Sequence, residues 1–295
     1  MKKFALTGAA GYIAPRHFKA IKDTGNDLIA ALDVHDSVGI IDSYFPNASF
    51  FIEYERFERH LEKLRREDNG IDYLSVCTPN FLHDSHVRLA LRMGASAICE
   101  KPLVLNPWNL DALQIIEEET GKRVYNILQL RIHESVIALK KKVESENKRH
   151  SVNLKYITSR GKWYDFSWKG DVHKSGGIAT NIGVHFFDML IYLFGEVKNY
   201  KSEISEPRKM KGTLELENAD VEWFLSIDES DLPEKEKLAG KRTFRSILID
   251  DEEFEFSAGF TDLHTKVYQD ILNGGGFGIE DARPSIELVH RLRKK

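Results

Sequence analysis

The most informative segment of the chain is Ser96-Ala97-Ile98-Cys99-Glu100-Lys101-Pro102-Leu103. It begins as a short apolar run, typical of a buried parallel strand, and ends in a carboxylate, an amine and a proline. Because proline cannot continue a strand ladder, we expect the strand to stop there. Open parallel sheets bind ligands beyond the carboxyl ends of their strands, which predicts Glu100 and Lys101 at the mouth of a cleft. A lysine at such a point can be desolvated and transfer protons; the alternative is an exposed Glu-Lys pair at a strand end.

The composition limits the classes of protein to which the chain can belong. Its 295 residues allow one large or two ordinary domains, and 42% hydrophobic with 30% charged residues is a soluble globular composition. The formal net charge of -4 gives no basic footprint for nucleic acid, and no apolar run approaches the length of a membrane span. Cys77 and Cys99 are expected to be reduced core thiols. With no apolar run long enough for a signal peptide, these features predict a cytoplasmic protein.

The beginning of the chain has the pattern of a dinucleotide-binding βαβ unit. A strand at Lys3–Thr7 is followed by the glycine-rich turn Gly8–Ala14, a helix, a second strand and then Asp33. Glycines let the backbone approach a pyrophosphate, and the helix N-terminus supplies amide donors and a positive dipole end. Asp33 is expected to bind both ribose hydroxyls of adenosine and to repel a 2′-phosphate, which favours NAD over NADP. The motif is imperfect, since Ala10 and Ala14 stand where glycines are usual, and a purely structural turn is the alternative.

The pattern of alternating strands and helices continues to about residue 130. A strand over 71–77 ends in Thr78-Pro79-Asn80, which we expect to contact the ribose and nicotinamide of the cofactor. His83 and His86 follow at a spacing that could face a metal, but no third ligand has a convincing spacing. One capping and one surface histidine, and no metal site, are therefore predicted. The alternation predicts a doubly wound parallel sheet, a Rossmann domain, over residues 1–130.

From about residue 150 the hydrophobic pattern changes to period two. It predicts a mostly antiparallel open sheet with one solvated face, within a second, α+β domain over residues 131–295. One apolar helix over 181–194 interrupts the strands, and two more, over 262–272 and 280–293, close the chain. The predicted strands are 152–158, 213–217, 221–227, 244–249 and 254–256.

Two features of the second half carry chemistry. His185 lies on the apolar helix after a Gly176-Gly177 loop, so it is either a satisfied core histidine or a base that faces a cleft. The run Ser159–Lys169 alternates aromatic with basic residues, and Lys174 lies just beyond it. Guanidinium groups bind phosphate or carboxylate, and aromatic faces stack on a base or sugar. The run therefore predicts a pocket for an anionic, ring-bearing ligand, with a solvated hairpin as the alternative.

Together these motifs resemble the Gfo/Idh/MocA oxidoreductases over most of the chain. The resemblance rests on the Gly8–Ala14 turn, Thr78-Pro79-Asn80, Glu100-Lys101-Pro102, and Gly176-Gly177 followed by Gly183-Val184-His185 and Asp188. Longer strings resemble, nearly word for word, one group of that family, the bacterial UDP-N-acetyl-2-amino-2-deoxy-D-glucuronate 3-dehydrogenases. These strings are Gly8-Ala9-Ala10-Gly11-Tyr12-Ile13-Ala14-Pro15-Arg16-His17, Tyr125-Asn126-Ile127-Leu128-Gln129-Leu130-Arg131, Thr158-Ser159-Arg160-Gly161 and Ala179-Thr180-Asn181-Ile182-Gly183-Val184-His185-Phe186.

The resemblance implies NAD-dependent oxidation of the C3 hydroxyl of a UDP-amino-uronic sugar, for lipopolysaccharide O-antigen synthesis. It also implies 2-oxoglutarate as a possible hydride acceptor, and a homotetramer built through the second sheet. The matching catalytic positions are Lys101 and His185. The residues expected to bind the cofactor are Gly8, Ala10, Gly11, Tyr12, Ile13, Asp33, Thr78, Pro79, Asn80, His83, Glu100, Lys101 and Gln129. Those expected to bind the substrate are Lys101, Arg160, Lys162, Trp163, Tyr164, Trp168, Lys169, Thr180, Asn181 and His185.

One departure from the family bears on the mechanism. Asn181 stands where many members have an aspartate, and an amide cannot take a proton, although it can hydrogen-bond the sugar. His185 is the easier base at neutral pH, whereas Lys101 needs a depressed pKa or acts charged on the developing alkoxide. The sequence leaves this choice open. The alternative functions are another sugar or polyol dehydrogenase of the family and a non-catalytic NAD-sensing protein.

Overall fold

The computed structural model describes residues 1–146, 148–255 and 262–293. The chain forms two compact units, Met1–Gln129 with Thr261–Arg283 and Leu130–Phe260 with Pro284–Lys295. The sequence pattern predicts a second domain that contains everything after residue 130. Instead, α10 (Leu263–Leu272) and the start of α11 (Ile279–Arg293) belong to the first unit.

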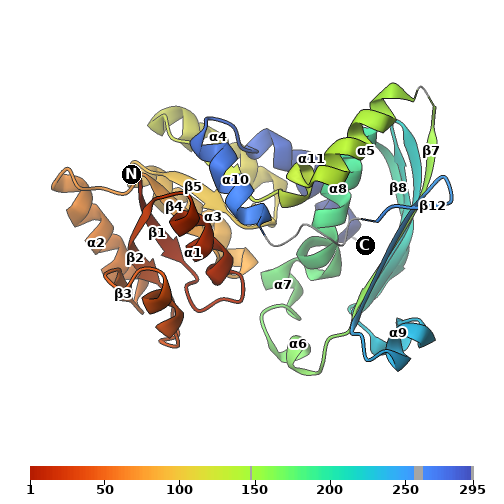
Figure 1. Ribbon diagram of the computed structural model, residues 1–295, viewed down its shortest axis with the longest axis horizontal. Coiled ribbons are helices and arrows are strands. Elements are labelled where there is room, and N and C mark those ends of the chain that lie inside the picture. Colours follow the sequence, from red (N-terminus) through yellow and green to blue (C-terminus); the bar gives the residue numbers. More distant parts are fainter. Residues whose placement is uncertain (147, 256–261, 294–295) are drawn as a thin grey trace. The chain divides into compact units, whose positions relative to one another are not determined.

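The first unit contains the predicted Rossmann sheet. Its strands pair in parallel in the order β3-β2-β1-β4-β5-β6, with helices packed on them (Figure 1). The strands are β1 (Lys3–Thr7), β2 (Asp27–Leu32), β3 (Ser49–Phe51), β4 (Tyr73–Val76), β5 (Ser96–Cys99) and β6 (Val124–Asn126). The helices are α1 (Ala14–Asp23), α2 (Tyr54–Arg66), α3 (His83–Arg92) and α4 (Pro107–Thr120), with short turns η1 (Gly39–Ser43) and η2 (Asn80–Leu82). A further turn, η3 (Gln129–Ile132), begins at the last residue before the second unit. Strand β3 was not predicted, because it has only three residues, and these are at most partly buried.

The packing of this unit follows from its apolar strands. The last three residues of β4 and of β5 are buried, as expected for strands covered on both faces. Helix α1 packs beside α10, and α3 packs beside α4 and against β4 and β5. The carboxyl ends of β1, β2, β4 and β5 therefore open at one edge, where the predicted cofactor residues follow each strand.

The second unit has the predicted, mostly antiparallel sheet. Its strand order is β12-β11-β7-β10-β9-β8. Among the described strands of this second sheet, only the β7–β10 pair is parallel. The strands are β7 (His150–Thr158), β8 (Val197–Ser205), β9 (Lys209–Leu216), β10 (Ala219–Ser226), β11 (Thr243–Ile249) and β12 (Glu252–Glu253). Part of the predicted strand 254–256 lies outside the described residues. Strand β8 was not predicted, because its middle residues are all exposed and supply no buried alternation.

Helices cover one face of this sheet (Figure 1). The helices and helical turns of the unit are α5 (Glu134–Ser145), α6 (Trp163–Phe166), α7 (Val172–Ser175), the π-helical η4 (Ala179–Gly183), α8 (Val184–Phe194), η5 (Glu229–Asp231) and α9 (Glu234–Leu238). Helices α5 and α8 lie on this face, whereas α9 lies at one end of the sheet (Figure 1). Phe187 of α8 meets the indole of Trp223 on β10 edge-on, with ring centroids 5.2 Å apart, and both side chains are fully buried. This contact holds α8 on the sheet.

The stretch Val172–Phe194 is also long and apolar enough to cross a membrane by length and composition. Its mean hydropathy reaches 1.4 over an 18-residue window, but 67% of that window is buried inside the fold. Such burial is typical of a core helix, since side chains that contact lipid are not covered by the protein itself.

The prediction of a surface histidine near the start of α3 was wrong. Both His83 and His86 are buried, at 1% and 5% exposure. His86 packs edge-on against Tyr54, and its Nδ1 atom has no hydrogen-bond partner among the residues that the structure describes. Burial, together with the smaller effect of the nearby His83, lowers the pKa of His86 to about 4. A neutral imidazole therefore stays in this core.

This burial predicts acid sensitivity of the fold. Below pH 6.5 the unfolded chain protonates His86 while the folded chain does not, so stability falls as the pH drops from 6.5 toward 4. We expect His86 alone to contribute roughly 2 kcal/mol of the loss between pH 7 and pH 5. Urea unfolding of wild type and His86→Leu at both pH values measures this share. If wild type and the variant lost the same free energy of unfolding between the two pH values, the assigned share of His86 would be contradicted. This comparison requires that their free energies of unfolding at pH 7 agree within about 1 kcal/mol.

Candidate functional site

The glycine-rich turn after β1 is built for close backbone approach. Gly8 has a φ of +85°, and a Cβ there would lie 2.5 Å from the carbonyl atoms of Cys77. Its amide donates to the carbonyl of Leu32 at 2.8 Å, which ties the turn to the end of β2. Only glycine meets both the positive φ and the close contact. The position thus requires the glycine that the motif predicts.

Asp33 is connected to the same turn. Its Oδ2 accepts a hydrogen bond from the amide of Ala10 at 2.9 Å, and its Oδ1 accepts one from the amide of His35 at 2.9 Å. Helix α1 follows with no side-chain cap and no acidic residue in its first turn. The N-terminus of α1 therefore has no carboxylate of its own to compete with a bound anion.

Two predicted cofactor residues present buried polar atoms without partners. Thr78 Oγ1 and Gln129 Oε1 are buried and make no hydrogen bond within the described part of the chain. Buried polar groups normally have partners, so these atoms fit a ligand that supplies hydrogen bonds. His83 Nδ1 lies 2.7 Å from the carbonyl oxygen of Pro102, and His83 Nε2 lies 2.9 Å from that of Thr78. The imidazole thereby links the ends of two strands. Burial lowers the pKa of His83, whereas the two carbonyl oxygens, which can only accept, oppose this shift because they favour a ring that donates from both nitrogens.

The carboxylate of Glu100, at the end of β5, is buried and not an exposed partner of Lys101. Its Oε1 lies 2.9 Å from His264 Nε2 and 3.1 Å from His17 Nε2, and its Oε2 accepts from the Lys101 amide at 3.2 Å. Burial by itself would raise the pKa of Glu100, but the hydrogen bonds from the two histidines hold it well below its usual range. Lys101 follows it, half-buried, at the carboxyl end of the strand.

In the second unit, the segment before α8 is tightly constrained. Gly176 has a φ of +78°, and a Cβ there would meet the Thr180 side chain at 2.6 Å. Thr180 is fully buried, and its Oγ1 has no hydrogen-bond partner among the described residues. One turn after His185, Asp188 accepts two hydrogen bonds from Arg131, from Nη2 at 2.8 Å and from Nε at 3.0 Å. This buried ion pair fixes the helix that carries His185.

The aromatic and basic run contains the short helix α6 and not the solvated hairpin of the alternative interpretation. The Tyr164 hydroxyl is buried and accepts a hydrogen bond from Asn181 Nδ2 at 3.2 Å. The Lys169 amine lies 5.5 Å from the Trp163 ring and 5.6 Å from the Trp168 ring. Burial lowers the pKa of Lys169, and the positive charge of Arg160 lowers it further. Two cations held close together in this way are stabilised by an anion.

Other predicted site residues have less distinctive surroundings. Tyr12 is 87% exposed on the turn before α1, and Lys162 is exposed on the loop before α6. Asn80 is buried in η2, with Pro79 before it, and Gly11 and Ile13 lie in the turn itself. The sequence reasoning gave no role to His17, His264, Tyr268 or Arg131. His17 and Arg131 lie inside strings quoted for the resemblance, whereas His264 and Tyr268 have no local sequence signal.

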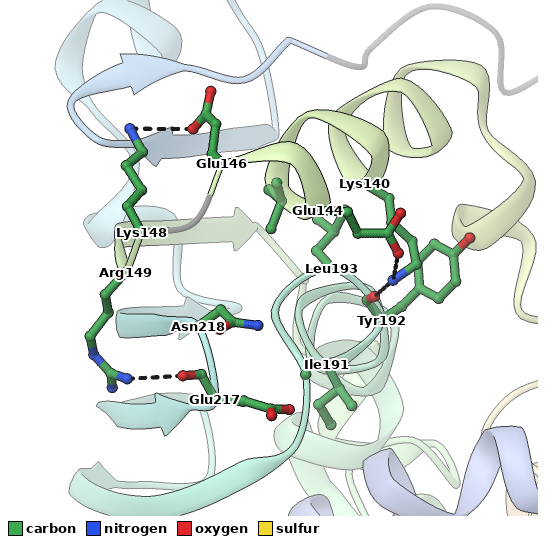
Figure 2. Close-up of a pocket in the computed structure, with 12 residues that line it drawn as sticks. Lys140, Glu144, Glu146, Lys148, Arg149, Ile191, Tyr192, Leu193, Glu217 and Asn218 are labelled. Carbon is green, nitrogen blue, oxygen red and sulfur yellow. Dashed lines mark hydrogen bonds and ion pairs between the residues drawn. The ribbon is translucent and has the colours of Figure 1, made fainter.

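A cavity of about 870 Å³ in the second unit contains none of the predicted site residues. Figure 2 shows charged side chains around it that already have partners. The Lys140 amine donates to the carbonyl of Tyr192 at 2.8 Å and lies 3.1 Å from Glu144, and Lys148 lies 3.3 Å from Glu146. Since these charges are compensated, the cavity gives no sign of binding a charged ligand.

The comparisons with known proteins define the family. Residues 2–127 match the NAD-binding Rossmann fold of the oxidoreductase family GFO_IDH_MocA, and residues 141–229 match its C-terminal alpha/beta domain. The chain belongs to the Gfo/Idh/MocA oxidoreductases, and its first domain is an NAD-binding Rossmann domain, as predicted.

Solved structures give the closer relationship. The chain is 54% identical to the WlbA (WbpB) dehydrogenase of Thermus thermophilus in complex with NAD and α-ketoglutarate, with a TM-score of 0.97 over 100% of this chain and 95% of that one. A second structure of that dehydrogenase, in complex with NAD and UDP-GlcNAcA, is 53% identical with the same TM-score and coverage.

Curated relatives are more distant. The glucose-6-phosphate 3-dehydrogenase of Bacillus subtilis is 26% identical over 202 residues, which are 66% of this chain and 54% of that protein. The inositol 2-dehydrogenase of Rhizobium meliloti is 27% identical over 199 residues, 66% of this chain and 55% of that protein. The matches thus span about half the length of these two relatives.

Gly8 gives a stability prediction with a matched control. We expect Gly8→Ala to cost roughly 2–4 kcal/mol, because it combines an unfavourable φ with a clash against Cys77. Gly25→Ala has a similar φ of +72° but nothing within 4 Å of the new Cβ, and should cost about 1–2 kcal/mol. Denaturant unfolding measures both costs, and calorimetry should show weakened NAD binding for Gly8→Ala alone. Equal costs would contradict the role of the close approach.

Asp33 gives a prediction about cofactor choice. We expect Asp33→Asn to keep an oxygen for the Ala10 amide but to lose the charge that repels a 2′-phosphate. The ratio of NAD to NADP affinity should therefore fall about tenfold, which corresponds to a change of about one to two kcal/mol in the difference between the two binding free energies. Asp33→Ala should in addition weaken NAD binding, since the turn loses its hydrogen bond. Titration calorimetry with both nucleotides measures these changes, and an unchanged ratio in Asp33→Asn would refute the assignment.

Proposed function

We propose that this protein is an NAD-dependent dehydrogenase that oxidises the C3 hydroxyl of UDP-N-acetyl-2-amino-2-deoxy-D-glucuronate to the 3-keto sugar nucleotide. The observation that carries the proposal is the full-length match, at 54% identity, to a dehydrogenase crystallised with NAD, a second structure of which contains UDP-GlcNAcA. A fold match alone would leave the substrate open, because members of one fold act on many substrates.

NAD fits the residues of the first unit. The Gly8–Ala14 turn and the uncapped start of α1 would hold the diphosphate, and Asp33 the adenosine ribose. Thr78 and Gln129 offer unpartnered buried oxygen atoms to the rest of the cofactor. When bound, NAD supplies the acceptor for the hydride that leaves C3. The remaining assignments, Tyr12, Pro79, Asn80 and His83, stay predictions from the resemblance.

Lys101 and His185 are the residues proposed to handle the proton. As the C–H bond at C3 breaks, the hydroxyl proton must leave oxygen, and a base near neutral pH removes it most readily. An imidazole suits this role, which favours His185, while a charged Lys101 would stabilise the developing alkoxide. Asn181, hydrogen-bonded to Tyr164, can orient the sugar but cannot carry the proton.

The substrate's anionic groups have candidate partners in the second unit. Burial lowers the pKa of Lys169, the nearby charge of Arg160 adds to this effect, and the indoles of Trp163 and Trp168 flank the amine. A diphosphate or uronate carboxylate would relieve this repulsion, and the indoles can stack on a ring. Lys162 and the Thr180 hydroxyl complete the proposed set.

The wider context is also proposed. We place the enzyme in the cytoplasm, in keeping with two buried free cysteines, and in the synthesis of lipopolysaccharide O-antigen sugars. We infer a homotetramer and no association with membranes or nucleic acid. 2-Oxoglutarate is the proposed hydride acceptor, because the related Thermus dehydrogenase was crystallised with NAD and α-ketoglutarate.

The test is to incubate the protein with NAD, 2-oxoglutarate and UDP-N-acetylglucosaminuronic acid. Mass spectrometry should show a sugar nucleotide that has lost two hydrogens. Recycling of NADH would keep absorbance at 340 nm flat, so a repeat without the 2-oxoacid distinguishes recycling from release. Bound NAD without any product would contradict the substrate while leaving the cofactor assignment in place.

Variants of the two proposed catalytic residues sharpen this test. We expect Lys101→Ala and His185→Asn each to lower turnover at least about 100-fold while NAD still binds within a few-fold of wild type. Lys63→Ala and His60→Asn on α2, which carries none of the candidate residues, serve as matched controls. Full turnover in either site variant would remove that residue from the mechanism.

A further inference from the structure

A buried hydrogen-bonded chain lies beside Lys101, and the proposed reaction does not yet use it. It consists of Ser75, Tyr268, His17, Glu100 and His264, all from the first unit. The Tyr268 hydroxyl lies 2.6 Å from Ser75 Oγ and 2.7 Å from His17 Nδ1. From His17 the chain continues to Glu100 Oε1, which His264 also contacts. None of the five residues is more than 7% exposed.

The chemistry of these groups assigns the direction of every hydrogen bond. An ionised carboxylate only accepts, so His17 and His264 must each donate from Nε2. Burial lowers the pKa of His17 against the opposing effect of Glu100, so the His17 ring is neutral and its Nδ1 accepts. Tyr268, whose pKa burial raises well above its ordinary value, then donates to Nδ1, and Ser75 donates to Tyr268. Each of these donors has an acceptor, and Glu100 is held in its charged form.

The carboxylate connects two functional parts of the first unit. His17 lies on α1, the helix that begins at the glycine-rich turn, and His264 and Tyr268 lie on α10. The second oxygen of Glu100 accepts from the backbone amide of Lys101 at 3.2 Å. Since the other donors lie 83 and 164 residues away in sequence, the carboxylate is held in place by tertiary structure and not by its own loop.

We propose that His17, His264 and Tyr268 are positioning residues for the sugar oxidation: through the buried Glu100 carboxylate they fix the backbone at Lys101 and keep a negative charge beside it. This inference rests on the proposed function. The charge favours the protonated form of Lys101, so Lys101 stabilises the alkoxide and the proton goes to His185.

Other ionisable groups surround Glu100 and Lys101, and they contribute to the electrostatic environment in which Glu100 acts on Lys101. They come from both strand ends and from three helices. Those that face Glu100 or its partners are Arg16 and His17 on α1, Cys77 after β4, His83 and Asp84 on α3, Cys99 on β5, and His264 and Tyr268 on α10. Burial raises the pKa of both thiols well above the ordinary value, and the thiols therefore stay neutral. Glu100 is thus the anion closest to the Lys101 backbone in this group.

The first variant, Tyr268→Phe, removes one hydroxyl and leaves His17 Nδ1 without its donor. We expect kcat to fall about tenfold, with NAD affinity and the KM for the sugar nucleotide within about threefold of wild type. Tyr73→Phe is the matched control, because the Tyr73 ring stacks on the same Phe4 ring as Tyr268 does, but Tyr73 is not a member of the hydrogen-bonded chain. The control variant Tyr73→Phe should keep the kcat of wild type. An unchanged kcat in Tyr268→Phe would overturn the proposal.

The second variant, Glu100→Gln, keeps the shape of the side chain and removes the charge. The alkaline limb of the pH profile of kcat, where Lys101 loses its proton, should move down by roughly one pH unit. A merely structural role would lower the rate without moving this limb. An unmoved limb in a folded, NAD-binding variant would overturn the charge effect, and Tyr268→Phe still tests positioning if Glu100→Gln does not fold.

Two measurements separate this proposal from the proposed function. The same three atoms, His17 Nε2, Glu100 Oε1 and His264 Nε2, lie close enough together to bind a metal ion. A stoichiometric divalent metal in the purified protein, found by mass spectrometry of its elements, would overturn the hydrogen-bonded assignment. If wild type oxidises no sugar nucleotide, the proposed function fails. The hydrogen-bonded chain is then tested by ¹⁵N NMR spectra of the imidazole rings, which should show His17 and His264 protonated at Nε2. Protonation of His17 at Nδ1 would refute the assigned hydrogen-bond directions.

Discussion

The first unit depends on one buried carboxylate. Removing a charge from water costs several kcal/mol unless donors replace the lost hydration, and Glu100 has three of them. They come from α1, from α10 and from the backbone of the next residue, so the folded state must bring these elements to the end of β5. A loss of any partner leaves a charge that is buried and only partly compensated. The same interaction therefore holds α10 in the Rossmann unit and limits how the strand end at Lys101 can move.

The second unit fixes its own candidate residue by related physics. Arg131 and Asp188 form a two-point ion pair that is almost fully buried, one turn along the helix from His185. Gly176 allows Thr180 to pack against the backbone at the start of the same segment. Since both contacts are buried and directional, α8 has little freedom to rotate on the sheet. Each unit thus stabilises the backbone of its candidate catalytic residue by an ionic contact that belongs to that unit.

Much of the fold and part of the candidate site follow from local sequence pattern. The strands with continuous or alternating burial, the Gly8 turn and the acid at the end of β2 were predicted, because each has a short-range signature. Strands β3 and β8 were not, since neither has a row of buried apolar residues. The burial of His86 and the contacts of His264 depend on partners distant in sequence, and no local pattern reports those. The return of α10 to the first unit was missed for the same reason.

The π-helical turn Ala179–Gly183 has a consequence for how this region can change in evolution. A π-helical turn contains one residue more than the α-helical turn it replaces. Loss of one residue there would make the segment continuous with α8 and would turn every preceding side chain by about 100° around the helix axis. Thr180 and Asn181 would then point to different neighbours, although no side chain had been exchanged. Insertions and deletions, more than substitutions, are thus the changes that can present a new set of side chains before His185.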